Sequence, residues 1–358
     1  MGKKAVLEKF DLIVKGFSKK DRIALVHDLD ADGVSSGAIT FNAIKFLRGK
    51  EPDLVVTQQY KTVRLLPKTI QLLKKNKINK IVCVDFAFDQ QPESLKETES
   101  IVDQILVLDH HKDYKYAANK KTFILKANYI KEVDPSKYPT SKLVFDLFSR
   151  HVNLEKFSWV ASVGLIGDNQ LKEWEPFVQG SVADHNTSLE EIYTVTNIIS
   201  AIEVLVPEKL NDLLYFIANS SKPKDVIKSK FAKYSKTLDA QVSKILEKFE
   251  KKKEVFEKQQ LVWFEFEADS NIKSAVINKV SNELYPNKTI IFIQDKNDGF
   301  VSFSARRQDF KVKTNDLLEK CVKGFENAGA GGHIPAAAGR IMKKDLAEFK
   351  KRVLKELS

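Results

Sequence analysis

Four short apolar runs in this chain each end in acidic or histidine residues. The four clusters are His27-Asp28-Leu29-Asp30-Ala31-Asp32-Gly33, Asp85, Asp109-His110-His111 and Asp168. Carboxylates beside an apolar run are costly unless a counter-charge neutralises them. Because the same arrangement recurs four times, we predict that the clusters share a cation.

The apolar runs of the first part of the chain alternate with helical segments. The candidate strands are Arg22–His27, Leu54–Gln58, Lys80–Asp85, Gln104–Asp109 and Thr122–Leu125, and the clearest helices are Ser35–Leu47 and Leu66–Lys74. This alternation is typical of a parallel sheet covered by helices on both faces. The ligand crevice of such a sheet lies beyond the carboxyl ends of its strands. Three of the four clusters fall at those ends and can therefore converge.

The rest of the chain predicts a helical region, a connector and a second α/β pattern. The predicted segments are a mainly helical stretch from Thr140 to Leu214, one charged helix from Asp225 to Gln259, strands at Leu261–Phe266, Thr289–Gln294 and Val301–Ala305, and a helix at Ile272–Leu284. Asn297-Asp298-Gly299 indicates a hairpin turn, and a Gly-rich loop is expected at Gly329–His333. The expected domains are residues 1–220, a connector helix 221–259, and residues 260–358.

Composition limits the class of protein without identifying it. The net charge of +11 indicates a polyanionic partner such as nucleic acid. The apolar runs are too short for a membrane span, and the N-terminus lacks the apolar core of a secretory signal. Cys83 and Cys321 lie far apart, which predicts two buried free thiols and no zinc site. We therefore expect a cytoplasmic protein without a membrane association.

The first cluster has the chemistry of a site for a hard cation. Asp28, Asp30 and Asp32 alternate, so on a continuing strand their side chains would share one face. Gly33 then allows a sharp turn into a helix, whose N-terminus attracts phosphate. A calcium loop would need Glu at its twelfth position, where Ile39 stands, so calcium is excluded.

The other clusters enlarge the pool of metal ligands. Asp85, His110 or His111, and Asp168 raise it beyond the needs of one cation. Mixed imidazole and carboxylate ligands favour manganese over magnesium. Two such ions about 3.5–4 Å apart can activate a water and stabilise the leaving oxygen of a displacement at phosphorus. Taken singly, each Asp also fits a helix cap, and the His pair fits a structural role.

The same residues resemble the motifs of the DHH phosphoesterase superfamily. The matching segments are Asp28-x-Asp30-x-Asp32-Gly33, Asp85, Asp109-His110-His111 and Asp168. The segment Gly331-Gly332-His333-x-x-Ala336-Ala337-Ala338-Gly339 resembles the GGHxxAAG signature of the family's DHHA1 domain, with one extra residue before Gly339. The resemblance implies an α/β fold, with an N-terminal parallel-sheet DHH domain and a smaller C-terminal α/β DHHA1 domain joined by a long helix.

The resemblance also implies roles for individual residues. Asp30 and Asp32 would ligate the metals, Asp85 would bridge them, and His110 and Asp168 would complete the set, with either His27 or Asp28 as a further ligand. His111 would lie near the scissile phosphate and Asp109 would orient its neighbours. The implied substrate-binding residues are Ser304, Arg306, Gly331, Gly332 and His333.

The function implied is a RecJ-like, manganese-dependent exonuclease that hydrolyses single-stranded DNA or RNA in a cleft between its domains. Magnesium is a possible substitute for manganese. The alternatives are an enzyme for short substrates (nanoRNA, linear or cyclic dinucleotides, or 3′-phosphoadenosine 5′-phosphate) and a non-catalytic replication scaffold. A replication or repair partner is compatible with each. Strand polarity, the choice between DNA and RNA, and the oligomeric state are left open.

Overall fold

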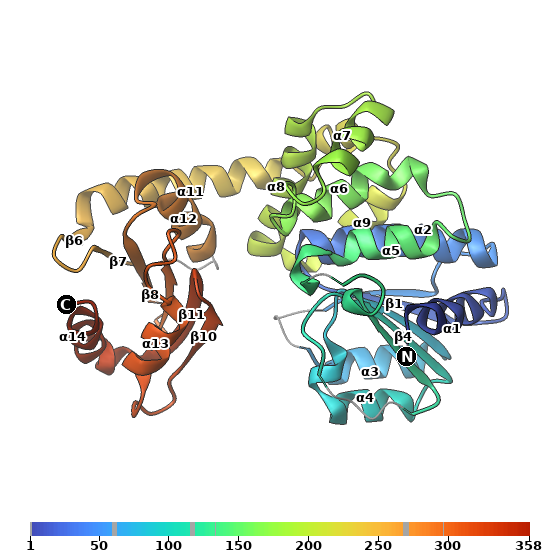
Figure 1. Cartoon of the computed structure of the whole chain (residues 1–358), viewed down its shortest axis with the longest axis horizontal. Helices are drawn as coiled ribbons and strands as arrows, with labels where there is room; N and C mark the ends of the chain where they lie inside the picture. Colours follow the sequence, from blue (N-terminus) through green and yellow to red (C-terminus); the bar gives the residue numbers. More distant parts are fainter. Residues whose placement is uncertain (1, 59–62, 115–118, 133, 268–271, 296) are drawn as a thin grey trace. The chain divides into compact units, whose positions relative to one another are not determined.

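The chain folds into two compact units, Met1–Ser235 and Lys236–Ser358, in the computed structural model (Figure 1). The structure describes residues 2–58, 63–114, 119–132, 134–267, 272–295 and 297–358. Each unit has its own buried apolar core. Among the described residues, no helix combines the length and the apolar character that a bilayer crossing requires.

The first unit is built on a five-stranded parallel sheet, which confirms the predicted fold class. Its strands, in the spatial order β2-β1-β3-β4-β5, are Leu54–Thr57, Ile23–His27, Lys80–Val84, Gln104–Asp109 and Thr122–Lys126. The strands β1, β3 and β4, whose ends precede three of the acidic clusters, are therefore neighbours. Their clusters meet at one edge because the strands run in the same direction.

Helices cover both faces of this sheet (Figure 1). On one face lie α1 (Lys3–Lys15), α2 (Ala31–Arg48) and α5 (Thr140–Phe148), and on the other α3 (Pro67–Lys75) and α4 (Pro92–Glu99). Side chains alternate along each strand, so Leu25 packs with the first group and Val26 with the second. Of the remaining helices, α6 (Ser158–Gly167), α8 (Leu189–Leu205) and α9 (Leu210–Ala218) pack against α2. The helix α7 (Glu175–Asp184) packs against α6 and α8, and α10 (Pro223–Ile227) packs against α8.

The segment after β1 departs from the prediction. β1 ends at His27 and α2 begins at Ala31, so Asp28, Asp30 and Asp32 do not lie on a continuing strand. The helix begins early because the Asp30 carboxylate accepts the Gly33 N–H at 2.9 Å and caps it. Gly33 serves a close approach, since a Cβ there would lie 2.6 Å from the Asp28 carbonyl oxygen.

The single helix expected over 225–259 was also wrong. The chain forms α10, then α11 (Ala232–Lys252), then the strand β6 (Glu254–Phe256). The break before α11 contains Phe231, which is buried in the first unit's core. After Lys252 the backbone leaves the helix because β6 pairs with the next strand, Glu254 opposite Trp263.

The second unit contains a six-stranded mixed sheet in the order β10-β11-β9-β8-β7-β6. Strands β7 to β11 are Leu261–Glu267, Thr289–Asp295, Phe300–Arg306, Gly329–His333 and Ala336–Met342. The helices are α12 (Lys273–Lys279), which continues into a π turn at Val280–Leu284, α13 (Thr314–Val322) and α14 (Leu346–Glu356). The helices α13 and α14 cover the face that carries Trp263 and Phe303.

Two turn predictions in this unit have different outcomes. The hairpin between β8 and β9 is confirmed, and Asn297 and Gly299 have φ values of 57° and 85°. The Gly-rich loop was wrong, because Gly329–His333 is strand β10, paired along its length with β11. Ile334 and Pro335 form the turn of this second hairpin, so the extra alanine of the segment is absorbed in the regular ladder of β11.

Candidate metal centre

Three groups of potential ligands lie at the carboxyl edge of the parallel sheet, the ligand atoms of each within 4.8 Å of one another. The first group comprises Asp32, His110 and Asp168. The second comprises Asp28, Asp30 and Asp85. The third, Asp85, His110 and His111, shares one residue with each of the others. Six of the seven predicted metal ligands are therefore brought together.

Asp85 and His110 link the first two groups. The Nε2 atom of His110 lies 3.4 Å from Asp85 Oδ1 and 3.4 Å from Asp168 Oδ2. Asp85 directly follows β3 and is almost fully buried. Its φ of 55° is unusual for a residue other than glycine, and its N–H is held by the Leu108 carbonyl at 3.0 Å. This strained backbone turns the carboxylate toward both groups.

The Asp32 carboxylate is held by the start of α5. Its Oδ2 accepts the Thr140 N–H at 2.6 Å and its Oδ1 accepts the Ser141 N–H at 2.9 Å. The Thr140 hydroxyl donates to Asp85 Oδ1 at 3.0 Å. A Cβ at Gly164 of α6 would lie 2.6 Å from Asp32 Oδ1, so glycine there leaves room for the carboxylate.

Burial and mutual repulsion raise the pKa values of the clustered carboxyl groups. Burial, followed by the charge of Asp30, raises the pKa of Asp28 to about 7. Burial and the charge of Asp32 raise the pKa of Asp168 to about 9. The pKa of Asp85 is raised well above its usual value by the same two causes, and burial raises that of Asp32.

These residues fit a divalent cation. The carboxylates are too close and too buried to be charged together without a counter-charge. Their oxygens and the His110 nitrogen form a mixed donor set of the kind that binds divalent metal ions. The structure therefore contains a candidate metal centre, in agreement with the shared cation expected from the sequence.

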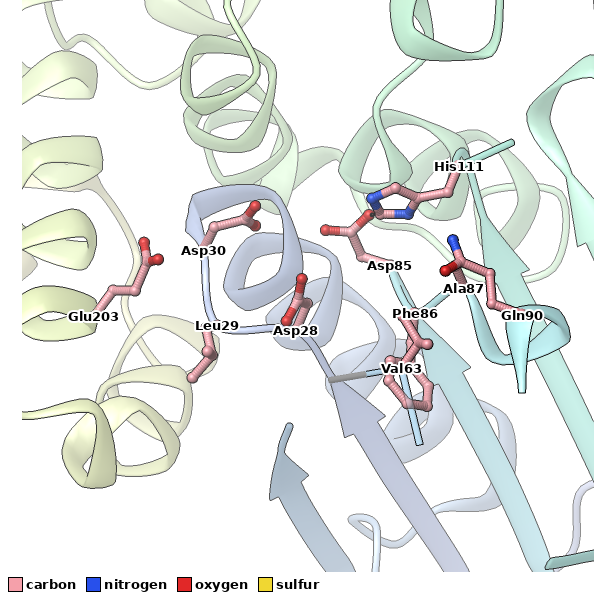
Figure 2. Close-up of a pocket in the computed structure, with 10 residues that line it drawn as sticks. All are labelled: Asp28, Leu29, Asp30, Val63, Asp85, Phe86, Ala87, Gln90, His111 and Glu203. Atoms are coloured by element: carbon pink, nitrogen blue, oxygen red, sulfur yellow. Dashed lines mark ion pairs between the residues drawn. The ribbon is translucent and has the colours of Figure 1, made fainter. Parts of the chain in front are cut away.

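A cavity of about 320 Å³ opens beside this centre (Figure 2). The side chains of Asp28, Asp30, Asp85 and His111 point into it from three successive loops at the sheet edge. Glu203 of α8 also lines it and was missed, because one Glu near the end of a largely apolar helix gives no signal in the sequence. Apolar and polar residues complete the wall: Leu29, Val63, Phe86, Ala87 and Gln90.

His27 lies outside all three ligand groups. Its imidazole is fully buried, with Nδ1 2.7 Å from the Asp28 carbonyl and Nε2 3.1 Å from Thr57 Oγ1. Asn211 Oδ1 lies 3.3 Å from the same Nε2. Burial lowers the pKa of His27 to about 4, so the ring is neutral. Of the two candidates in the first motif, the structure brings Asp28 to the centre and leaves His27 in the core.

The exposed His111 ends a series of charged residues that is buried beyond it and that we name the lysine ladder: His111, Asp109, Lys126 and Asp89. His111 Nδ1 lies 2.7 Å from Asp109 Oδ1, and Lys126 Nζ lies 2.5 Å from Asp109 Oδ2 and 2.9 Å from Asp89 Oδ1. Lys126 and both aspartates are buried. Sequence reasoning missed Lys126 and Asp89, although a Lys that ends the apolar strand β5 at the same edge was a usable signal.

The lysine ladder holds Asp109 charged. Burial alone would raise the pKa of Asp109, but the hydrogen bond from His111 and the charge of Lys126 outweigh it and lower that pKa. Burial likewise opposes the charge on His111, but the hydrogen bond and charge of Asp109 raise its pKa to about 8. His111 is therefore largely protonated at neutral pH.

The predicted substrate residues of the second unit lie on three successive rows across the strands β9, β11 and β10. Ser304, Ala338 and Gly331 form the first row, Gly332 lies on the second, and Arg306, Ala336 and His333 form the third. Because side chains alternate along β9, Ser304 and Arg306 point to the face away from Phe303 and α13. Gly331 has open space where a Cβ would be, whereas Gly332 has φ 138° and needs glycine.

The two adjacent arginines differ in environment. The half-buried Arg306 donates from Nε to Asn278 Oδ1 at 2.9 Å and, among the described residues, has no carboxylate partner. Arg307 is buried and paired with Asp309 at 2.6 Å, which is a structural role. His333 ends β10, and its side chain lies outside the described part of the structure.

Two family models match the chain. One is described as the DHH family, N-terminal domain, and matches residues 22–167. The other is the DHHA1 domain and matches residues 257–358. No curated protein matches the chain.

Solved structures with the same fold are distant in sequence. The DHH domain of a member of the s1p family of ribosomal proteins has a TM-score of 0.75 at 12% identity, with 99% of this chain and 90% of that one covered. The exonuclease RecJ bound to manganese has a TM-score of 0.68 at 15% identity, with 98% and 94% covered. CDC45 from Entamoeba histolytica has a TM-score of 0.57 at 10% identity, with 99% of each chain covered.

At these identities the solved structures establish the fold alone. The two family models cover the predicted substrate residues and every residue of the metal centre except Asp168, which directly follows the matched DHH segment. The chain therefore contains a DHH family N-terminal domain and a C-terminal DHHA1 domain.

Proposed function

We propose that the protein is a two-metal phosphodiesterase that degrades single-stranded DNA or RNA as an exonuclease. One observation carries the proposal: two separate sets of three ligands, Asp32–His110–Asp168 and Asp28–Asp30–Asp85, are joined by the contact between His110 and Asp85. A single ion would leave one set of buried carboxylates without a counter-charge.

Each set of ligands would hold one divalent cation. Manganese is the favoured ion because a nitrogen ligand accompanies the oxygens, and magnesium is a possible substitute. When bound, such ions supply an activated water and neutralise charge on the leaving oxygen. The likeness to RecJ bound to manganese supports this assignment.

His111 is the candidate general acid. Asp109 holds its Nδ1 and thereby directs the ring into the cavity, where Nε2 is available to a substrate. With a pKa raised to about 8, the ring carries a proton at neutral pH and can give it to the leaving oxygen. Asp109 acts as a positioning residue, because it contacts His111 and Lys126 and does not line the cavity.

The second unit would bind the polyanion. Arg306 offers guanidinium donors on the same row as the Gly-rich strand, whose backbone a phosphate can approach closely. The net charge of +11 favours a polymer over a small neutral substrate. The buried free cysteines Cys83 and Cys321 agree with an enzyme of the reducing cytoplasm.

Two alternatives remain. The first is an enzyme confined to short oligonucleotides, (cyclic) dinucleotides or 3′-phosphoadenosine 5′-phosphate. The second is a replication scaffold, which the fold likeness to CDC45 favours. Intact ligand sets support catalysis, and a catalytic protein can also dock on a replication or repair partner.

The test uses 5′- and 3′-labelled single-stranded DNA and RNA, from dinucleotides to about forty nucleotides, with manganese. An Asp85→Ala protein is the control. Progressive shortening of long strands, abolished by the substitution, would support the exonuclease and reveal its polarity and sugar preference. Cleavage of di- to tetranucleotides alone would move the assignment to a short-substrate enzyme. No metal-dependent cleavage of any substrate would favour the scaffold.

A further inference from the structure

The 307–314 loop, between β9 and α13, presents an aromatic ring to solvent among basic residues. Phe310 is 60% exposed, and its φ of 59° is a costly conformation for a bulky residue. Lys311 and Lys313 are exposed beside it. Packing does not explain this ring, because most of it lies in water.

The loop is held firmly at both ends. The Arg307 N–H donates to the Pro335 carbonyl at 3.0 Å, and the Thr314 N–H donates to the Ile334 carbonyl at 2.8 Å. The ion pair of the buried Arg307 with the partly exposed Asp309 stiffens the first half of the loop. Ile334, in the turn to which the loop is tied, is 40% exposed and adds a second apolar side chain at this end of the sheet.

The loop adjoins the candidate phosphate-binding row. It begins directly after Arg306, the last residue of β9, which is paired with Ala336 of the Gly-rich hairpin. A polyanion held at Arg306 therefore meets exposed lysines and an exposed ring in the next segment of the chain. Basic side chains interleaved with aromatic ones are typical of surfaces that bind single-stranded nucleic acid.

We propose that Phe310 is a stacking platform for one unpaired base of a single strand, with Lys311 and Lys313 at the flanking phosphates. The proposal rests on the proposed function, since it deepens the substrate class of the same enzyme. Every base has a π face, so the platform selects unpaired bases without reading their sequence. A duplex, whose bases are already stacked, gains nothing from it.

The test measures binding of the full chain to labelled oligothymidylate and to an abasic oligomer of the same length, by fluorescence anisotropy without added metal. Phe310→Leu should weaken binding of the base-containing strand about tenfold, and Phe310→Trp should preserve it. Neither variant should change binding of the abasic strand. Leu284→Ala, another exposed apolar residue of this unit, is the matched control and should match the wild type.

Unchanged binding by Phe310→Leu would overturn the platform, and so would an equal loss for both strands, which would indicate a structural effect. If the protein cleaves single strands but its binding to them does not depend on Phe310, the nuclease proposal holds and the stacking role of Phe310 is wrong. If binding depends on Phe310 but no strand is cleaved, the stacking role holds and the nuclease proposal is wrong.

Discussion

Two groups of carboxylates lie at the same edge of the parallel sheet, and the pKa shifts in the first group are opposite in direction to that of Asp109 in the second. Burial and repulsion raise the pKa values of Asp28, Asp85 and Asp168. In the lysine ladder the pKa of Asp109 is lowered although it is just as buried. The difference is the hydrogen bond from His111 and the charge of Lys126, whose ammonium lies between Asp109 and Asp89.

The comparison distinguishes carboxylates that position a neighbouring side chain from carboxylates that are candidate metal ligands. Where the protein supplies its own cation, the carboxylates form a fixed support for His111. In the metal centre, where no Lys or Arg of the described structure pairs with the carboxylates, a metal ion from solution would neutralise them. Four experiments test this contrast, from the largest expected effect to the smallest.

His111 lies where the two groups meet, 2.7 Å from Asp109 and 3.9 Å from Asp85. We expect His111→Gln to lower kcat by about 10²–10⁴-fold, the usual contribution of a general acid, because Gln does not give up a proton. Steady-state kinetics with manganese would measure this. Manganese should still raise Tm of the variant, because neither of the two proposed metal-binding sets contains His111. A lost metal response would instead identify His111 as a ligand.

Lys126→Met should remove the neutralising charge that distinguishes the lysine ladder from the metal centre. It leaves Asp109 and Asp89 buried without the ammonium between them, so the free energy of unfolding should fall by about 3–5 kcal/mol. Urea denaturation would measure the loss. The matched control is Lys45→Met, whose exposed pair with Glu51 is worth less than about 1 kcal/mol. Equal effects of the two substitutions would contradict the ladder's role.

Metal should stabilise the protein more strongly as the pH rises. Asp28 and Asp168 have usual pKa values of 3.8 that are raised to about 7 and about 9 in the folded chain. The folded chain therefore binds more protons than the unfolded one, and this stability is lost as pH rises through those values. Cations replace the protons, so the Tm shift caused by manganese should grow between pH 6 and about 9. At a manganese concentration one hundred times Kd, metal binding should raise the free energy of unfolding by about 2.7 kcal/mol.

Thermal melts in a pH series, with and without manganese, would measure this dependence. A manganese shift that is constant across the series would contradict the raised pKa values. Asp85→Asn should raise Tm of the metal-free protein, because it removes one of the repelling charges.

Gly164 and Gly180 offer a matched pair of the same substitution. A Cβ at Gly164 would lie 2.3 Å from Ser141 Oγ, so Gly164→Ala should cost about 1–3 kcal/mol in unfolding free energy and weaken manganese binding. Gly180, within α7, has nothing within 4 Å, and Gly180→Ala should stabilise by about 0.5–1 kcal/mol. Chemical denaturation of both variants would measure the two changes in unfolding free energy. A stabilising effect of both substitutions would show that packing at Gly164 is loose.

The sequence predicted what depends on strand periodicity. Each strand of the parallel sheet follows from an apolar run, and the position of Asp85 or Asp109 follows from where its run ends. The division of the ligands into two sets did not follow, because the side-chain directions of Asp28 and Asp32 depend on α2 beginning at Ala31. A helix cap and a strand continuation were equally consistent with alternating aspartates.

Contacts between segments far apart in the sequence could not be predicted from local sequence patterns either. Glu203 reaches the cavity from a helix whose sequence reads only as apolar and buried. The break near Phe231 follows from packing against the first unit's core, which charge patterning over 225–259 does not reveal.

The starts of α2 and α5 have a consequence for the charge of the centre. Asp30 caps α2, and Asp32 accepts the first two amides of α5. Each helix N-terminus carries roughly half a positive elementary charge, so about one unit of counter-charge is built into the backbone here. Unlike a metal ion, this charge does not diffuse away. The backbone therefore offsets part of the carboxylate charge at this sheet edge whether or not an ion is bound.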